Sequence, residues 1–191
     1  MNKKSKKILI SIKPTWCNLI LNNEKIIELR KSVPNFKEPC EVYIYCTKEN
    51  PRLEILTKND YRSLLEKLNE NKKSINKELK AHNKITYLNE EGGLGYLANG
   101  YVVGKFRFIK YLQFQIRNNE LFTVDDQGEE FKQDINLFTN LSRVSFNDLV
   151  KYKGNSKYVY GWVIEDVEIF DKPLPLTKFG LSKAPQSWQY I

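Results

Sequence analysis

Two long runs of β-branched and aromatic residues do most to limit the folds open to this chain. Residues 101–116 and 158–170 are both rich in residue types that favour strands. Each run is much longer than the usual strand of about five or six residues. Gly104 stands near the start of the first run, where a bulge lets a strand bend. The pattern predicts two long strands, the first of them curved, as in the wall of a small β-barrel.

Shorter segments with strand or helix patterns surround these two runs. Residues 8–12 form an apolar run of strand length, and in residues 41–47 aliphatic residues or cysteine alternate with tyrosines, which also predicts a strand. Residues 188–191 are expected to form a last strand that closes the sheet. Thr15 is expected to cap a short helix with one apolar face after the first strand. The S-x-x-D pattern that starts at Ser145 predicts the N-terminus of another helix. The chain should therefore combine one sheet with a few helices.

Three other segments are expected to lie outside this core. Residues 1–7 are a basic arm, and residues 48–95 are charged and Asn-rich with leucines at helical spacing, which predicts a helical insertion. Residues 118–140 form a polar insertion with a probable turn at residues 125–128. Because single cores usually run to roughly 100–200 residues, we expect one domain over residues 1–191.

Charge and rare residues narrow the classes of function. Thirty-one basic and 23 acidic residues leave a formal charge of +8, which favours polyanionic partners but also occurs in proteins without them. The single histidine, His82, excludes a multi-histidine metal site and a histidine-based triad. Cys17, Cys40 and Cys46 lack the paired spacing of a zinc site, and no apolar run is long enough to cross a membrane. We expect a cytoplasmic protein without metal, cofactor or membrane contact.

One short segment brings a carboxylate and cations together. In residues 25–30 the strand period of two puts Ile27 and Leu29 on one face and Glu28 and Arg30 on the other. This polar face is either part of a ligand site or an ion pair on the protein surface.

The order of the expected strands and helices says more about the fold than any single segment does. A strand that ends at residues 11–14, Ser-Ile-Lys-Pro, is followed by a short helix and then by residues 23–30, Asn-Glu-Lys-Ile-Ile-Glu-Leu-Arg. This arrangement resembles the GxKxxExR signature of the ASCH domain (activating signal cointegrator homology), a branch of the PUA-like β-barrels. Asn23 replaces the first glycine, and asparagine also tolerates a left-handed backbone. Residues 160–167 and 184–188 are similar to later segments of the family.

The resemblance implies an α+β fold with a small PUA-like barrel of about six mostly antiparallel strands, flanked by helices. It also implies a cleft between the first helix and the barrel that binds RNA, another single-stranded nucleic acid, or a nucleotide, with an unpaired or modified base. Three aromatic side chains are expected to form walls of this cleft, unless they belong to the core. The candidate ligand-binding residues are Ser11, Lys13, Lys25, Glu28, Arg30, Tyr160, Trp162, Ser187 and Trp188.

Two other functions stay open from the sequence. The resemblance extends to an enzymatic branch of the family, small amidohydrolases of acetylated cytidine whose similar motif, GxKxxTxR, has a threonine nucleophile. Glu28 occupies the position of that threonine here, so the reaction should not be transferred. Lys25 and Glu28 remain candidates for general acid and base chemistry on RNA. Alternatively, the insertion at residues 48–95 binds a protein partner.

Overall fold

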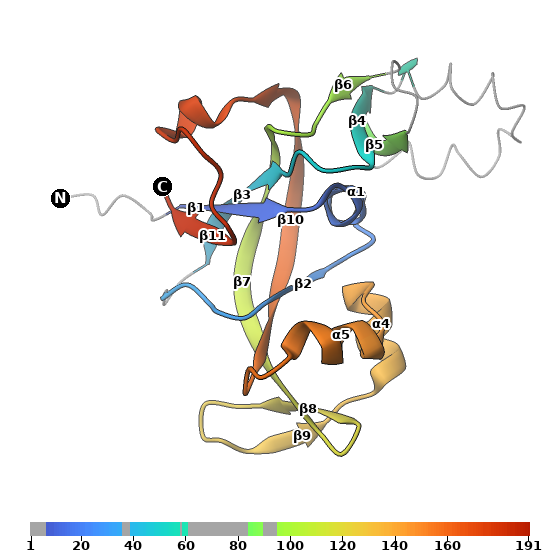
Figure 1. The fold of residues 1–191 in the computed structure, drawn as a ribbon, viewed down its shortest axis with the longest axis vertical. Coiled ribbons are helices and arrows are strands. Elements are labelled where there is room, and N and C mark those ends of the chain that lie inside the picture. Colours follow the sequence, from blue (N-terminus) through green and yellow to red (C-terminus); the bar gives the residue numbers. More distant parts are fainter. Residues whose placement is uncertain (1–6, 36–38, 58, 61–83, 90–94) are drawn as a thin grey trace, which may run out of the picture.

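The computed structural model describes residues 7–35, 39–57, 59–60, 84–89 and 95–191. Most of the expected basic arm lies outside these ranges. So do residues 61–68, whose leucine spacing predicted a helix with a surface for a protein partner, and residues 74–81, where a second helical stretch was expected. The remaining elements form one curled sheet, a smaller sheet and three α-helices (Figure 1).

The main sheet has the strand order β11-β1-β3-β7-β10-β2, and β8 and β9 extend it from β7. The strands are β1 (Ile8–Ile12), β2 (Ile27–Arg30), β3 (Cys40–Cys46), β7 (Val102–Arg117), β8 (Glu120–Val124), β9 (Glu130–Lys132), β10 (Val159–Leu174) and β11 (Trp188–Tyr190). β1 and β3 are parallel, and the other pairs described in this sheet are antiparallel. The predicted α+β fold with a mostly antiparallel sheet is confirmed.

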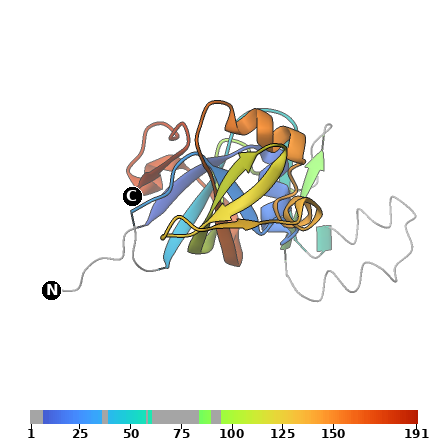
Figure 2. The same ribbon diagram turned by 90° about the horizontal axis from the view of Figure 1, so that it is seen from below.

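The two long strands cause the sheet to curl. β7 and β10 each contain 16 residues and pair along most of their length, with register shifts that increase twist. One shift in the pairing of β3 with β7 falls directly next to Gly104, as the sequence predicted. The curl of the sheet, seen in Figure 2, brings β2 at one end of the strand order toward β1 near the other end. Arg30 bridges the two strands by donating to the Ser11 carbonyl at 2.8 Å. We call this opening between β1 and β2 the seam.

The helices expected in residues 48–95 lie outside the described residues, but the described parts of this segment form strands. The segment contributes β4 (Arg52–Thr57) and β5 (Lys84–Asn89), which form a second sheet with β6 (Tyr96–Leu97) in the order β5-β4-β6. This small sheet lies beside helix α1 (Pro14–Leu21), where Asn22 Nδ2 donates to the Thr86 carbonyl at 3.0 Å. The insertion therefore begins and ends with strands.

Helix boundaries follow local capping rules with one exception. The expected cap at Thr15 is wrong, because α1 already begins at Pro14 with Lys13 as N-cap and no side-chain cap. After α1, Asn23 adopts a left-handed conformation with φ 58°, as expected for the residue in the glycine position. Helix α5 (Phe146–Lys153) begins with the predicted cap, in which Ser145 Oγ accepts from the Asp148 amide at 3.1 Å.

The helices cover opposite faces of the sheet. Helix α1 fills the concave face, where its buried Cys17 and Ile20 join the largest core cluster. Helices α4 (Ile135–Ser142) and α5 pack on the other face, over Ile27 and Leu29 of β2. A short 3-10 helix, η1 (Leu176–Phe179), precedes β11. Glu28 and Arg30 accordingly point to the concave side, as the alternation predicted.

Among the helices of the described residues, none is long and apolar enough to span a lipid bilayer.

Candidate functional site

A cavity of about 500 Å³ lies at the seam, between the end of β1, helix α1, strand β2 and helix α5. The strand β2 forms its inner wall. Its lining side chains include Ser11, Lys13, Trp16, Lys25, Glu28, Arg30, Thr47, Glu49, Asp148, Tyr152 and Gln186. A volume of this size falls within the usual range for small-molecule and cofactor sites, about 300–1,000 Å³.

The cavity is open at this place because β2 is an edge strand. Ile164 N donates to the Ile26 carbonyl of the segment that leads into β2 at 3.0 Å. Because backbone groups point alternately to the two sides of a strand, those of Arg30 also face β10, and those of Leu29 face the seam. The Tyr152 hydroxyl from α5 reaches this free edge and donates to the Leu29 carbonyl at 3.4 Å. Burial raises the pKa of Tyr152 above its ordinary value.

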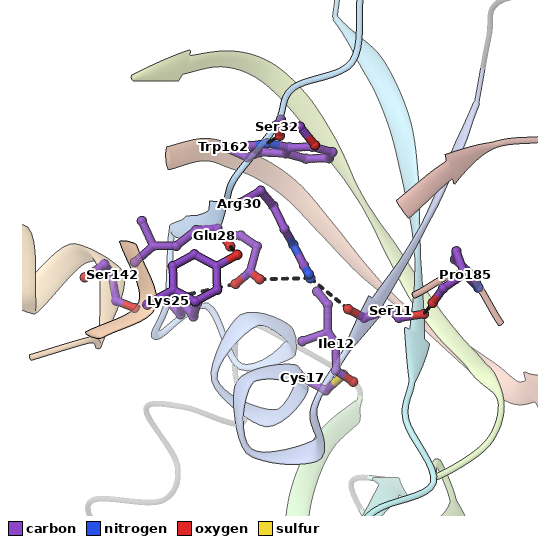
Figure 3. Close-up of polar contacts among 12 residues, drawn as sticks. Ser11, Ile12, Cys17, Lys25, Glu28, Arg30, Ser32, Ser142, Trp162 and Pro185 are labelled. Carbon is purple, nitrogen blue, oxygen red and sulfur yellow. Dashed lines mark hydrogen bonds and ion pairs between the residues drawn. The ribbon is translucent and has the colours of Figure 1, made fainter. Parts of the chain in front are cut away.

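Glu28 is the centre of the polar wall. Arg30 Nη2 lies 3.0 Å from Glu28 Oε1, and Lys25 Nζ lies 3.6 Å from Glu28 Oε2 (Figure 3). The same Arg30 Nη2 donates to the Ser11 carbonyl across the seam. The exposed fractions of the Lys25, Glu28 and Arg30 side chains are only 1%, 8% and 12%. The carboxylate is therefore held from both sides in a largely dry setting, which excludes a simple surface ion pair.

Lys25 is enclosed on every side that the structure describes. Its ammonium donates to the Ser142 carbonyl at the end of α4, contacts Glu28, and lies 5.0 Å from the centre of the Trp16 ring. Burial lowers the pKa of Lys25, and the charge of Glu28 acts in the opposite direction. Lys25 thus connects β2, α1 and α4 and orients the carboxylate of Glu28.

Arg30 has a buried donor without a partner among the described residues. This donor is its Nε atom. A buried guanidinium nitrogen without a partner is uncommon, and a ligand or an ordered water often supplies the missing acceptor.

The lining contains as many cationic as anionic side chains. Lys25 and Arg30 face Glu28, and Lys13 Nζ lies 3.4 Å from Glu49 Oε2. The positive charge of the chain is thus not concentrated in this cavity. Lys13, Lys25 and Arg30 each already have an acidic partner, so none of the three is free to neutralise a phosphate in this arrangement.

Five of the predicted ligand-binding residues do line the cavity: Ser11, Lys13, Lys25, Glu28 and Arg30. The contribution of Ser11 differs from that of a free hydroxyl. Its Oγ donates to the Pro185 carbonyl at 2.6 Å, while its own carbonyl accepts from Arg30. Ser11 therefore connects the closing segment of the chain to the seam.

The prediction that Tyr160, Trp162 and Trp188 form walls of the cavity is wrong, because none of them lines it. Trp162 has an exposed fraction of 0%, because it packs against Phe108 in the core and donates its Nε1–H to the Ser32 carbonyl. Trp188 donates to the Ser32 hydroxyl and lies against Trp162. Tyr160 packs on the same core cluster and meets the Tyr111 ring edge-on.

Ser187 is also outside the lining. Its carbonyl accepts from the Ser11 amide at 2.8 Å, and its side chain borders a separate hollow in residues 180–189.

Trp16 and Tyr152 are the aromatic side chains that do line the cavity. Trp16 was not selected from the sequence, because the helical period puts it on the apolar face of α1 together with residues of the core. A signal for Tyr152 was available, because Asp148 and Tyr152 are four residues apart in the predicted helix and so share one face. What the sequence did not contain was the position of that face over β2.

Comparisons with known proteins give one kind of match. No family model matches the chain, and no curated protein matches it. Solved structures do match: the ASCH protein of Zymomonas mobilis has 13% sequence identity and a TM-score of 0.52, over 97% of this chain and 87% of that one. A tyrosine-to-phenylalanine variant of the same protein has 12% identity, 97% and 90% coverage, and a TM-score of 0.52. A serine-to-alanine variant has 12% identity, 98% and 89% coverage, and the same TM-score.

At this level of identity the likeness concerns the fold. It extends over 97–98% of this chain and 87–90% of the matched chains. The chain therefore has the fold of an ASCH domain, which the resemblance in sequence implied.

Proposed function

We propose that the cavity at the seam binds one unpaired nucleobase, either of a free nucleotide or of single-stranded RNA. The observation that carries this proposal is the Glu28 carboxylate, held between Lys25 and Arg30 in a cavity with two aromatic side chains. A fixed polar group inside a partly apolar pocket orients a ligand, and the apolar walls supply contact area.

The charge balance favours recognition of a base over recognition of a phosphate. A phosphate needs cations that are free to approach it, whereas Lys25 and Arg30 already contact Glu28. A nucleobase is uncharged and offers several hydrogen-bond donors and acceptors along one edge. The lining side chains can satisfy such an edge without a net charge.

Trp16 and Tyr152 supply flat surfaces for a base. Stacking of one base on an aromatic side chain contributes about 1–3 kcal/mol when it is tested by alanine substitution. Because a base within a duplex already stacks and pairs with its neighbours, only an unpaired or extruded base can enter a cavity of this kind. Single-stranded RNA should therefore bind more tightly than a duplex.

Lys25 is better explained as a positioning residue than as a general base. Its ammonium has partners on Glu28, Ser142 and Trp16, and its side chain is 1% exposed. A group that accepts a proton from a substrate must reach it. This enclosure supports binding over the RNA-processing alternative.

A tyrosine substitution tests the proposal, and the chain offers a matched control. Tyr152 and Tyr101 are each 39% exposed, but only Tyr152 lines the cavity. We expect Tyr152→Ala to weaken the binding of single-stranded RNA about tenfold, as lost stacking predicts. Tyr101→Ala should leave the affinity unchanged. Fluorescence anisotropy with labelled single-stranded and duplex RNA measures both. Equal affinities of the wild type for the two RNAs, or equal effects of the two substitutions, would contradict the proposal.

A further inference from the structure

We infer that Glu28 makes the cavity selective for a base with two adjacent hydrogen-bond donors, namely guanine. This inference rests on the proposed function and specifies its ligand.

Each oxygen of Glu28 has one cationic partner. Arg30 Nη2 contacts Oε1 at 3.0 Å and Lys25 Nζ contacts Oε2 at 3.6 Å. A carboxylate offers about four acceptor positions, two on each oxygen. One position on each oxygen is therefore available for a ligand. The two cations approach the carboxylate from opposite sides, so its orientation is fixed before a ligand arrives (Figure 3).

Two parallel acceptors select an edge with two parallel donors. On its pairing edge guanine presents N1–H and the 2-amino group side by side, and these can donate to the two oxygens at once. Adenine and cytosine present an amino group beside a ring nitrogen that is itself an acceptor, so one carboxylate oxygen would face a lone pair. Uracil presents a single N–H between two carbonyls. The expected order of affinity is guanine first, adenine and cytosine next, and uracil last.

The low exposure of the site strengthens this discrimination. Glu28 is 8% exposed and its two partners are 1% and 12% exposed, so little water can replace a hydrogen bond that a wrong base fails to make. A polar group that is left unpaired in a dry site costs more than the same group in water. Selectivity should therefore come from the mismatched edges as well as from the matched one.

Guanosine and inosine monophosphates provide the sharpest test. They differ only in the 2-amino group, which is one of the two donors assigned to Glu28. We expect the wild type to bind guanosine monophosphate about tenfold more tightly than inosine monophosphate, because one charge-assisted hydrogen bond is lost. Isothermal titration calorimetry measures both affinities on the complete chain without a label.

Substitution of two carboxylates separates the role of Glu28 from that of charge in general. Glu28→Gln replaces one acceptor oxygen by a donor and should reduce the ratio of the two affinities to about one. Glu49→Gln removes a carboxylate from the same cavity, 43% exposed, and should leave the ratio unchanged. A thermal unfolding curve for each variant shows whether it folds.

The outcomes distinguish the two proposals. Equal affinity of the wild type for the two nucleotides would overturn the guanine assignment whatever the variants do, and binding of single-stranded RNA in the same series would leave the proposed function standing. An unchanged ratio in a folded Glu28→Gln variant would overturn the role of Glu28. If no nucleotide and no single-stranded RNA binds at all, the proposed function itself falls.

Discussion

At the scale of single residues, Lys25 has the most unusual surroundings in the candidate site. Its ammonium is buried among Glu28, Arg30, Trp16 and the Ser142 carbonyl, and burial lowers its pKa from the ordinary value of 10.5. Below the lowered pKa, Lys25 is charged in the folded and unfolded chains alike, and the cost of burying the charge is present in full. As the pH rises from there toward 10.5, the unfolded chain binds more protons than the folded one, so the free energy of unfolding increases.

The corresponding prediction compares Lys25→Met with the wild type. We expect the difference in the free energy of unfolding, wild type minus variant, to rise with pH in the window just below 10.5. Urea denaturation from neutral pH to above that value measures it. Lys13→Met is the control, because Lys13 lines the same cavity but its side chain is 67% exposed. A difference that stays flat or falls over this window would show that Lys25 is not a buried charge.

Residue patterns predicted the polar wall of the site but not its aromatic walls. The strand period put Glu28 and Arg30 on one face, and that relation is local, so the sequence alone contains it. Which aromatic side chains lie near them depends on the curl of the sheet and on the docking of α5, more than 100 residues further along the chain. Trp162 is adjacent to Glu28 in the sheet register, yet the core encloses it.

At the scale of elements, the position of β2 depends on the absence of a side chain at Gly161. This residue pairs with Leu29, and a Cβ atom there would lie 2.7 Å from Ile27 Cγ2 and 2.7 Å from Phe114 Cε2. Both neighbours belong to the cluster that holds β2 against α4 and α5. The strand that carries Glu28 and Arg30 can therefore approach β10 closely only with glycine here.

We expect Gly161→Ala to lower the free energy of unfolding by about 1–3 kcal/mol, as overpacking in a core does, and to weaken ligand binding because β2 is displaced. Gly128→Ala is the control. Gly128 lies in the β8–β9 turn with φ +88° and open space around it, so this variant strains the backbone without moving β2. Denaturation and nucleotide titration of both variants should show lower stability in each but lower affinity only in Gly161→Ala. Wild-type affinity in Gly161→Ala would contradict the argument.

Element patterns were informative where one face of an element meets water. The cap at Ser145 was predictable from the local S-x-x-D pattern. The long strands β7 and β10 were predictable from their content of β-branched and aromatic residues. Strand β4 was not, because Leu53, Glu54, Ile55 and Leu56 are all buried, and a strand that is buried on both faces shows no alternation. The sequence therefore contained no strand signal for residues 52–57.

At the scale of the whole molecule, the excess of positive charge and the candidate site lie in different places. The chain carries a formal charge of +8, while the lining of the cavity is balanced in charge. Lys31 and Lys157 are examples of lysines exposed outside that lining. Long-range attraction of a polyanion and recognition of one base should accordingly be separable properties.

The dependence of affinity on salt concentration separates attraction of a polyanion from recognition of one base. The affinity for single-stranded RNA should fall as the salt concentration rises, because phosphates along the strand meet exposed lysines and release counterions. The affinity for guanosine monophosphate should change much less, since Lys13, Lys25 and Arg30 each have an acidic partner inside the cavity. Titrations of both ligands over a salt series give the two slopes. Equal slopes would mean that the cations of the cavity contact phosphate, and that the ion pairs seen with Glu28 and Glu49 open when the ligand binds.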